Sequence, residues 1–118
     1  MSRRTARVAD LLRTELSELI LREVQDPRVR LATVSAVDVS PDLRHARVRV
    51  SVLGEDVQRA ETVEALQHAR GFLRSRLAPR LRLRVVPELA FELDRGAEYS
   101  QRITDLLESL HDESDESA

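Results

Sequence analysis

The stretch ALQHARGFLRSRLAPRLRLRVVPELAFEL, residues 65–93, decides both the fold and the function that we predict. Its first part continues a helical pattern that begins near Asp56, and Pro79 ends this pattern after Leu77. Gly71 interrupts the pattern, because an interior glycine costs about 1 kcal/mol relative to alanine and allows backbone angles that other residues avoid. We therefore predict two short helices with a break at Gly71.

The second part of the stretch alternates like a β-strand. Apolar residues take the odd positions from Leu81 to Leu93, while arginines and glutamates take most of the even positions. Pro87 cannot donate a ladder hydrogen bond, so we expect this strand at the edge of a sheet. The predicted polar face of the strand carries three arginines, Arg80, Arg82 and Arg84.

The segments before this stretch predict a helix and a β-hairpin. Apolar residues at steps of three and four indicate an amphipathic helix from Arg4 to Gln25, which Asp26-Pro27 ends. Residues 31–39 are rich in β-branched side chains, and residues 45–52 alternate between polar and apolar ones. The turn residues Ser40-Pro41-Asp42-Leu43 lie between the two strands, as in a hairpin.

The end of the chain predicts one more helix and a tail. The helix runs from Ala97 to Leu110, and its apolar face consists of Tyr99, Ile103, Leu106, Leu107 and Leu110. The element order α-β-β-α-α-β-α predicts one α+β domain over residues 1–110, with a three-stranded sheet and a kinked helix pair. Residues 111–118 are acidic and lack apolar periodicity, so we expect a disordered acidic tail.

The composition limits the class of protein. The 118 residues include no cysteine, which excludes disulfides and thiolate metal sites. No apolar run approaches the roughly 20 residues of a membrane span, and no signal-peptide pattern follows Met1, so we expect a cytoplasmic protein. The formal net charge is −2, but five of the 21 acidic residues follow Leu107 and no arginine follows Arg102. The folded part is therefore mildly basic.

No arrangement of residues indicates catalysis. The three histidines, His45, His68 and His111, are far apart in the sequence and none has a second ligand at metal spacing. The chain also lacks a strand–turn–helix serine motif and both common phosphate-loop patterns. We expect a protein that is not an enzyme and that uses no cofactor and no small-molecule substrate.

The stretch from Ala65 to Pro87 contains six arginines and no acid. Repulsion among unpaired arginines destabilises a fold, so a partner should use this surface, and arginine forks match phosphate oxygens. The other interpretation is a solvated face whose acids come from elsewhere in the fold. Binding is the interpretation that we favour. The six residues are Arg70, Arg74, Arg76, Arg80, Arg82 and Arg84.

The aromatic residues and the N-terminus bear on the kind of binding. Phe72, Phe91 and Tyr99 all lie on apolar stripes, so we expect them in the core and expect recognition through phosphate, sugar and shape. A second basic cluster opposes the dipole at the start of the first helix. Contact with phosphate and fraying of the first turn explain this unfavourable position of basic residues equally well. Its members are Arg3, Arg4 and Arg7.

Five short motifs in one order resemble the bacterial ribosome-binding factor A family, over about residues 7–107. They lie at the exit of the first helix, in the hairpin, at the helix break, in the third strand and before the last helix. The motifs are Asp26-Pro27-Arg28, VDVSPDL at residues 37–43, Ala69-Arg70-Gly71 followed by Arg74, RVVPEL at residues 84–89 followed by Phe91, and Asp94.

The resemblance implies a type II KH-like fold, with the kink where KH domains carry their Gly-x-x-Gly loop. It also implies a factor that binds the free 30S ribosomal subunit late in assembly. Such a factor assists maturation of 16S rRNA near the 5′ terminal helix and supports growth in the cold. We expect it to be a monomer away from the ribosome.

The expected RNA contacts combine the arginine stretch and the kink. The first set is Ala69, Arg70, Gly71, Arg74, Arg76, Arg80, Arg82 and Arg84. The secondary candidates are Arg28, Arg30, Arg3, Arg4 and Arg7. The alternative function is a protein-interaction adaptor that places the same arginines on an acidic protein partner, and a pull-down with and without nuclease separates the two.

Overall fold

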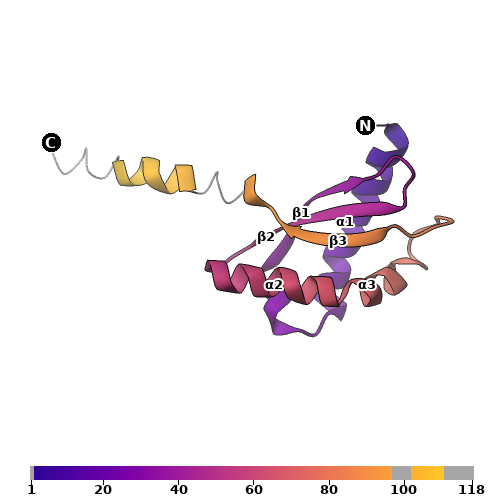
Figure 1. The fold of residues 1–118 in the computed structure, drawn as a ribbon, viewed down its shortest axis with the longest axis horizontal. Coiled ribbons are helices and arrows are strands. Elements are labelled where there is room, and N and C mark those ends of the chain that lie inside the picture. Colours follow the sequence, from indigo (N-terminus) through magenta and orange to yellow (C-terminus); the bar gives the residue numbers. More distant parts are fainter. Residues whose placement is uncertain (1, 97–101, 111–118) are drawn as a thin grey trace.

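A computed structural model of the chain describes residues 2–96 and 102–110. The elements follow the predicted order, with one additional 3-10 helix (Figure 1). They are α1 (Arg3–Glu23), η1 (Pro27–Leu31), β1 (Ala32–Val39), β2 (His45–Val52), α2 (Asp56–His68), α3 (Arg70–Leu77) and β3 (Glu88–Leu93). A further helix covers residues 102–110. The predicted acidic tail, residues 111–118, and the first part of the predicted last helix lie outside the described residues.

Helix α1 begins and ends where its sequence specifies. The hydroxyl of Ser2 accepts a hydrogen bond from the backbone amide of Thr5 at 3.2 Å, which caps the first turn. The helix stops before Asp26-Pro27, and the Asp26 carboxylate then caps the short helix η1. The buried face of α1 consists of Thr5, Val8, Ala9, Leu12, Leu16, Leu19 and Ile20.

The sheet has the order β1-β2-β3, with β1 and β2 antiparallel and β2 and β3 parallel. Alternate residues of β2 are buried, which confirms the half-buried strand predicted from the sequence. The polar residues between them face away from the core, and α1, α2 and α3 all contribute buried side chains to the core on the other face. The buried residues of β2 are Ala46, Val48, Val50 and Val52.

The helix break lies at Ala69, two residues before the glycine at which it was predicted. Ala69 has φ −84° and ψ −1°, and ψ near 0° differs from the about −42° of a regular helix. The chain therefore changes direction without a left-handed residue, and Gly71 becomes the second residue of α3. After the break, Leu73 and Leu77 point into the core between α3 and the rest of the domain.

Strand β3 is shorter than predicted. It begins at Glu88, where the prediction placed its start near Leu81. The reason is the register, because Glu88 pairs with His45, the first residue of β2, and no partner strand continues beyond that point. Leu81 and Pro87 are buried without joining the ladder. The predicted arginine face of the strand is therefore wrong, and residues 78–87 form a loop (Figure 1).

The helix of residues 102–110 does not cover the core. Its four large apolar side chains are all exposed, so the apolar face predicted from the sequence is not buried over the described residues. These side chains are Ile103, Leu106, Leu107 and Leu110. No helix in the described part of the chain has the length and apolarity that crossing a membrane requires.

Candidate nucleic-acid interface

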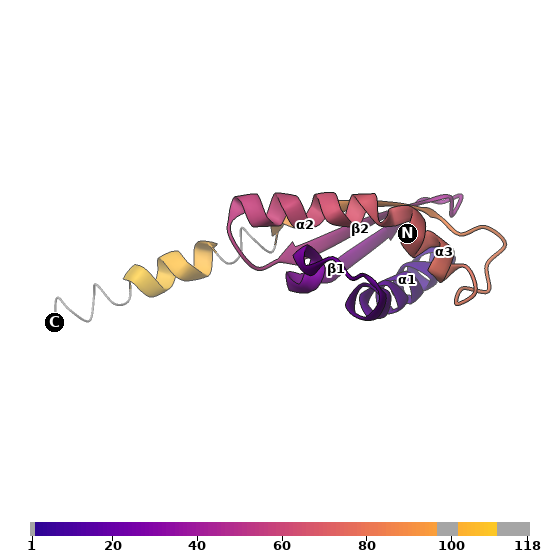
Figure 2. The same ribbon diagram turned by 90° about the horizontal axis from the view of Figure 1, so that it is seen from below.

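One end of the molecule gathers three segments that are distant in the sequence. The N-terminal end of α1, the β1–β2 turn and the loop of residues 78–87 lie there together (Figures 1 and 2). The backbone amide of Glu88 donates to the carbonyl of Arg44 at 2.8 Å and ties the end of the loop to the turn. We call this region the arginine end, since the segments carry Arg3, Arg4, Arg7, Arg44, Arg80, Arg82 and Arg84.

The turn itself is fixed by polar contacts. The Ser40 hydroxyl donates to the Asp42 carboxylate at 2.6 Å, and that hydrogen bond lowers the pKa of Asp42. Leu43 has φ +61°, a left-handed conformation that non-glycine residues rarely adopt. Arg44 follows it with an exposed side chain. Sequence reasoning missed Arg44, because only the register of β2 and β3 brings it beside the loop.

Two of the six arginines in the stretch have acid partners on α1. Arg76 lies 3.4 Å from Glu23, and Arg80 lies 3.0 Å from Glu15 and 3.6 Å from Glu18. The hydrogen bond that Arg80 donates to the Glu15 carboxylate raises the pKa of Arg80. For Arg76 and Arg80, the alternative interpretation therefore holds, because their acidic partners come from another part of the fold. Their predicted contact with phosphate stays a prediction, and it would compete with existing ion pairs.

The other four arginines have no carboxylate partner among the residues that the structure describes. Arg70 donates to the carbonyl of Gln67 at 3.1 Å. Arg74 donates twice to the carbonyl of Val86, at 2.8 and 3.1 Å, and so connects α3 to the end of the loop. Arg82 and Arg84 are exposed in the loop. A carbonyl does not neutralise a guanidinium, so all four keep a positive charge that an anion can use.

The start of α3 is open on the side of Gly71. A Cβ atom added to Gly71 would meet no atom within 4 Å, so the fold itself does not require glycine there. Ala69, in contrast, is half-buried and packs against the core. The open backbone at Gly71 lies between the exposed side chains of Arg70 and Phe72. Another chain could approach the backbone closely at this point.

One of the aromatic residues does not lie where the sequence placed it. Phe91 is 4% exposed and lies in the core, as predicted. Phe72 is 41% exposed, so its assignment to the core is wrong. The break at Ala69 changes which side of α3 faces the core relative to a continuous helix, so Phe72 points outward. The guanidinium carbon of Arg76 lies 5.2 Å from the centre of the Phe72 ring. Tyr99 lies outside the described residues.

The secondary candidates differ in their surroundings. Arg28 donates to Asp26 with its Nη2 at 2.7 Å, and this side-chain hydrogen bond lowers the pKa of Asp26. Arg30 is exposed on η1, with no carboxylate partner in the described part of the chain. The Thr62 hydroxyl donates to the carbonyl of Arg28 at 2.7 Å and holds η1 against α2. The N-terminal cluster, Arg3, Arg4 and Arg7, is exposed on the first turns of α1.

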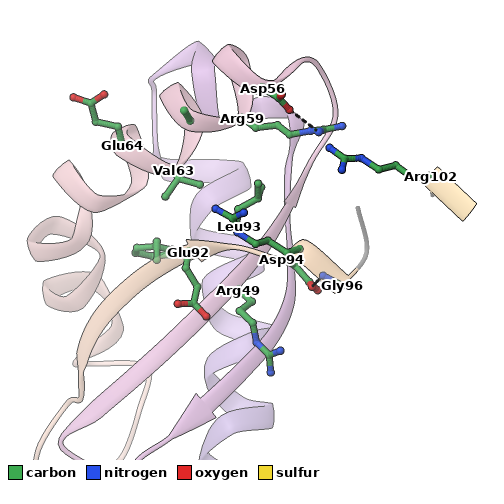
Figure 3. A pocket seen from close by; sticks show the side chains of 13 residues that line it. Arg49, Asp56, Arg59, Val63, Glu64, Glu92, Leu93, Asp94, Gly96 and Arg102 are labelled. Carbon is green, nitrogen blue, oxygen red and sulfur yellow. Dashed lines mark hydrogen bonds and ion pairs between the residues drawn. The ribbon is translucent and has the colours of Figure 1, made fainter. Parts of the chain in front are cut away.

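A pocket of about 1270 Å³ lies at the opposite end of β3, beside α2 (Figure 3). Its charges are mixed, and its acids already have partners. Asp56 pairs with Arg59 at 3.3 Å, and Asp94 accepts a hydrogen bond from Ser35 at 2.6 Å. Among the described residues, no group of three acids, histidines or cysteines is placed to hold a metal ion. The arginine end therefore carries a more uniformly positive charge than the surface around this pocket.

The parallel pairing of β2 with β3 and the two helices that meet at a kink define the class of protein as a KH-like α+β domain. A family model described as ribosome-binding factor A matches residues 4–107. The chain belongs to the ribosome-binding factor A family.

Individual relatives agree with this assignment. A ribosome-binding factor A from Thermomicrobium roseum is 45% identical over 119 residues, which cover 99% of this chain and 92% of the relative. The crystal structure of ribosome-binding factor A from Thermus thermophilus matches with a TM-score of 0.69 and 34% identity, over 77% of this chain and 97% of the other. A homology model of the Thermus factor, fitted into a cryo-EM map of a 30S–RbfA complex, matches with a TM-score of 0.62 and 34% identity, over 74% and 91%.

Proposed function

We propose that this chain is a non-catalytic assembly factor that binds the free 30S ribosomal subunit through 16S rRNA. Family membership supports this function, as does the fit of the Thermus relative into a 30S complex. The observation that carries the proposal is the set of four arginines without carboxylate partners, two of them on α3 with the open backbone of Gly71 and two in the loop that follows α3. We assign the binding to residues 1–110.

The phosphate contacts fall to Arg70, Arg74, Arg82 and Arg84. Guanidinium groups bind phosphate oxygens with two parallel hydrogen bonds, and charged donors make these bonds stronger than neutral ones. Gly71 allows an RNA backbone to approach the start of α3 without a steric conflict. Arg44, on the neighbouring turn, extends the positive surface beyond the predicted set.

These contacts make binding dependent on salt. Each neutralised phosphate releases counterions and contributes about 0.7–0.9 to the slope of log affinity against log salt. Four contacts then predict an affinity loss of about 10²-fold between 50 and 200 mM salt. A protein held mainly by apolar contacts would show a nearly flat response.

The test is sedimentation of tagged protein against free 30S subunits, whole ribosomes and polysomes. The wild-type protein should sediment with free 30S subunits. The variant Arg82→Glu/Arg84→Glu should lose at least about tenfold in affinity and about 1.5 in salt slope, because two phosphate contacts disappear. The variant Arg13→Glu/Arg22→Glu has the same charge change on exposed positions of α1 and serves as the control.

Equal affinity in the two charge-reversal variants would contradict the assignment of the loop to phosphate. A nuclease treatment completes the experiment. Loss of the partner after nuclease supports RNA, whereas its retention would support an acidic protein partner instead.

We propose that binding assists late 30S assembly and 16S rRNA processing near the 5′ terminal helix, most strongly in the cold. Cells depleted of the protein should then accumulate 16S rRNA precursors at low temperature. The wild-type gene should restore processing and Arg82→Glu/Arg84→Glu should not. Normal precursor levels in depleted cells would overturn this part while leaving 30S binding intact.

A further inference from the structure

We propose that Phe72 and Arg76 form a stacking platform for an unpaired base of the bound RNA. The inference rests on the proposed RNA binding and adds a second mode of contact to it. The sequence predicts recognition through phosphate, sugar and shape alone, because Phe72, Phe91 and Tyr99 all lie on apolar stripes. The exposed ring of Phe72 changes that expectation.

The ring of Phe72 lies on the outer surface of α3. Its neighbour Leu73 is fully buried, and so is Leu77, so the apolar face of α3 is complete without the ring. Exposure of 41% of an aromatic residue leaves apolar surface in water, which is unfavourable for the isolated protein. Phe91, the other described aromatic residue, is almost fully buried.

Arg76 fixes the ring from one side. Its guanidinium carbon lies 5.2 Å from the ring centre, within the about 6 Å of a cation–π contact. Glu23 holds the same guanidinium from α1 at 3.4 Å. The charge of Arg76 is thus balanced, which suits a positioning role more than a phosphate contact. The planar guanidinium and the ring therefore lie against each other on the surface of α3 before any partner binds.

The surroundings favour a nucleobase as the occupant. Arg70 and Arg74, one turn apart, offer phosphate contacts on the same short helix that carries the ring. No acid occurs between Ala65 and Pro87, so an RNA strand meets no repulsive carboxylate from this stretch. Gly71 leaves room for the backbone of that strand next to the ring. Unpaired bases stack on phenylalanine rings and on guanidinium planes alike.

The first test compares substitutions at position 72 in binding to free 30S subunits. Phe72→Leu keeps an apolar side chain but removes the aromatic face, and it should weaken binding by about tenfold. The salt slope should not change, since no phosphate contact is lost. Phe72→Tyr should restore the affinity. Val57→Ala removes an exposed apolar side chain of α2 and should bind like the wild type.

Two results would contradict the proposals. Wild-type affinity in Phe72→Leu would overturn the platform and leave the phosphate contacts standing. Failure of the wild-type protein to bind 30S subunits would overturn the proposed function itself. Circular dichroism should show the same melting temperature for Phe72→Leu and wild type, because the ring contributes little to the core.

The second test identifies what the ring touches. A photo-crosslinking residue at this position, Phe72→p-benzoylphenylalanine, should join the protein to 16S rRNA when the 30S complex is irradiated. The control places the same residue at Val57, where no cross-link to rRNA is expected. A cross-link from position 72 to a ribosomal protein, or no cross-link at all, would overturn the platform.

Discussion

At the scale of single residues, the role of each arginine depends on what faces it. Arg80 and Arg82 are two positions apart in one loop, yet only Arg80 meets carboxylates, those of Glu15 and Glu18. The pairing spans 65 residues of sequence, so the arginine count could not reveal it. Structural arginines and binding arginines are thus mixed within one stretch that looks uniform.

Substitution of Arg80 separates stability from binding. Arg80→Ala removes the contacts that connect the loop to α1, so the urea midpoint of unfolding should fall slightly. The salt slope of 30S binding should stay the same, because Glu15 and Glu18 already engage the Arg80 guanidinium. Arg82→Ala should do the opposite, with an unchanged midpoint and a slope lower by about 0.7–0.9. A slope that falls in Arg80→Ala would contradict this division.

Asp26 gives the fold a dependence on acid pH. Its hydrogen bond with Arg28 lowers the pKa in the folded state, so the interaction stabilises the protein fully above the unfolded value of about 3.9. The stabilisation is lost as the pH falls through the folded pKa. The wild-type protein should therefore be more stable than Asp26→Asn in urea at pH 7, and this difference should shrink below pH about 4. A difference that is independent of pH would show that Asp26 acts only as an uncharged cap.

At the scale of elements, the sequence predicts the periodic parts well. The amphipathic pattern of α1, the alternation of β2 and the stop at Asp26-Pro27 all appear in the structure, because each depends on local chemistry. The resemblance to the family added the KH-like arrangement, which periodicity alone does not provide.

The predictions fail where contacts between distant segments determine where an element begins or ends. Alternation predicted a strand from Leu81, but β2 begins only at His45, so the residues before Glu88 have no partner. The helix break was placed at Gly71, and its true position at Ala69 changes which side chains of α3 face the core. That shift exposes Phe72. When a break separates two helices, the apolar periodicity of the first does not predict which side chains of the second face the core.

The kink gives a prediction in which stability and binding change in opposite directions. Gly71→Ala adds a methyl group to a helix position with open space around it, so the free energy of unfolding should rise by about 0.4–1 kcal/mol. The same methyl group should hinder an RNA backbone and weaken 30S binding. Urea denaturation and sedimentation measure the two effects. Unchanged 30S binding in a stabilised variant would show that RNA does not approach the kink.

At the scale of the whole molecule, the fold separates two different surfaces. The arginine end combines the start of α1, the turn and the loop (Figure 1), while the opposite end carries a pocket with mixed charges (Figure 3). Leu53, the residue after β2, has an exposed side chain at that opposite end. Each strand connects the two ends. The molecule should therefore bind 16S rRNA in one orientation, with the arginine end toward the RNA.

Directed cleavage of rRNA tests this orientation directly, and the absence of cysteine from the chain makes it possible to place a single probe. Ala78→Cys puts an iron–EDTA tether in the exposed loop at the arginine end, and Leu53→Cys puts it at the opposite end. The tether at position 78 should cleave 16S rRNA strongly in the 30S complex, and the tether at position 53 should cleave it weakly. Stronger cleavage from position 53 would show that the arginine end does not face the RNA.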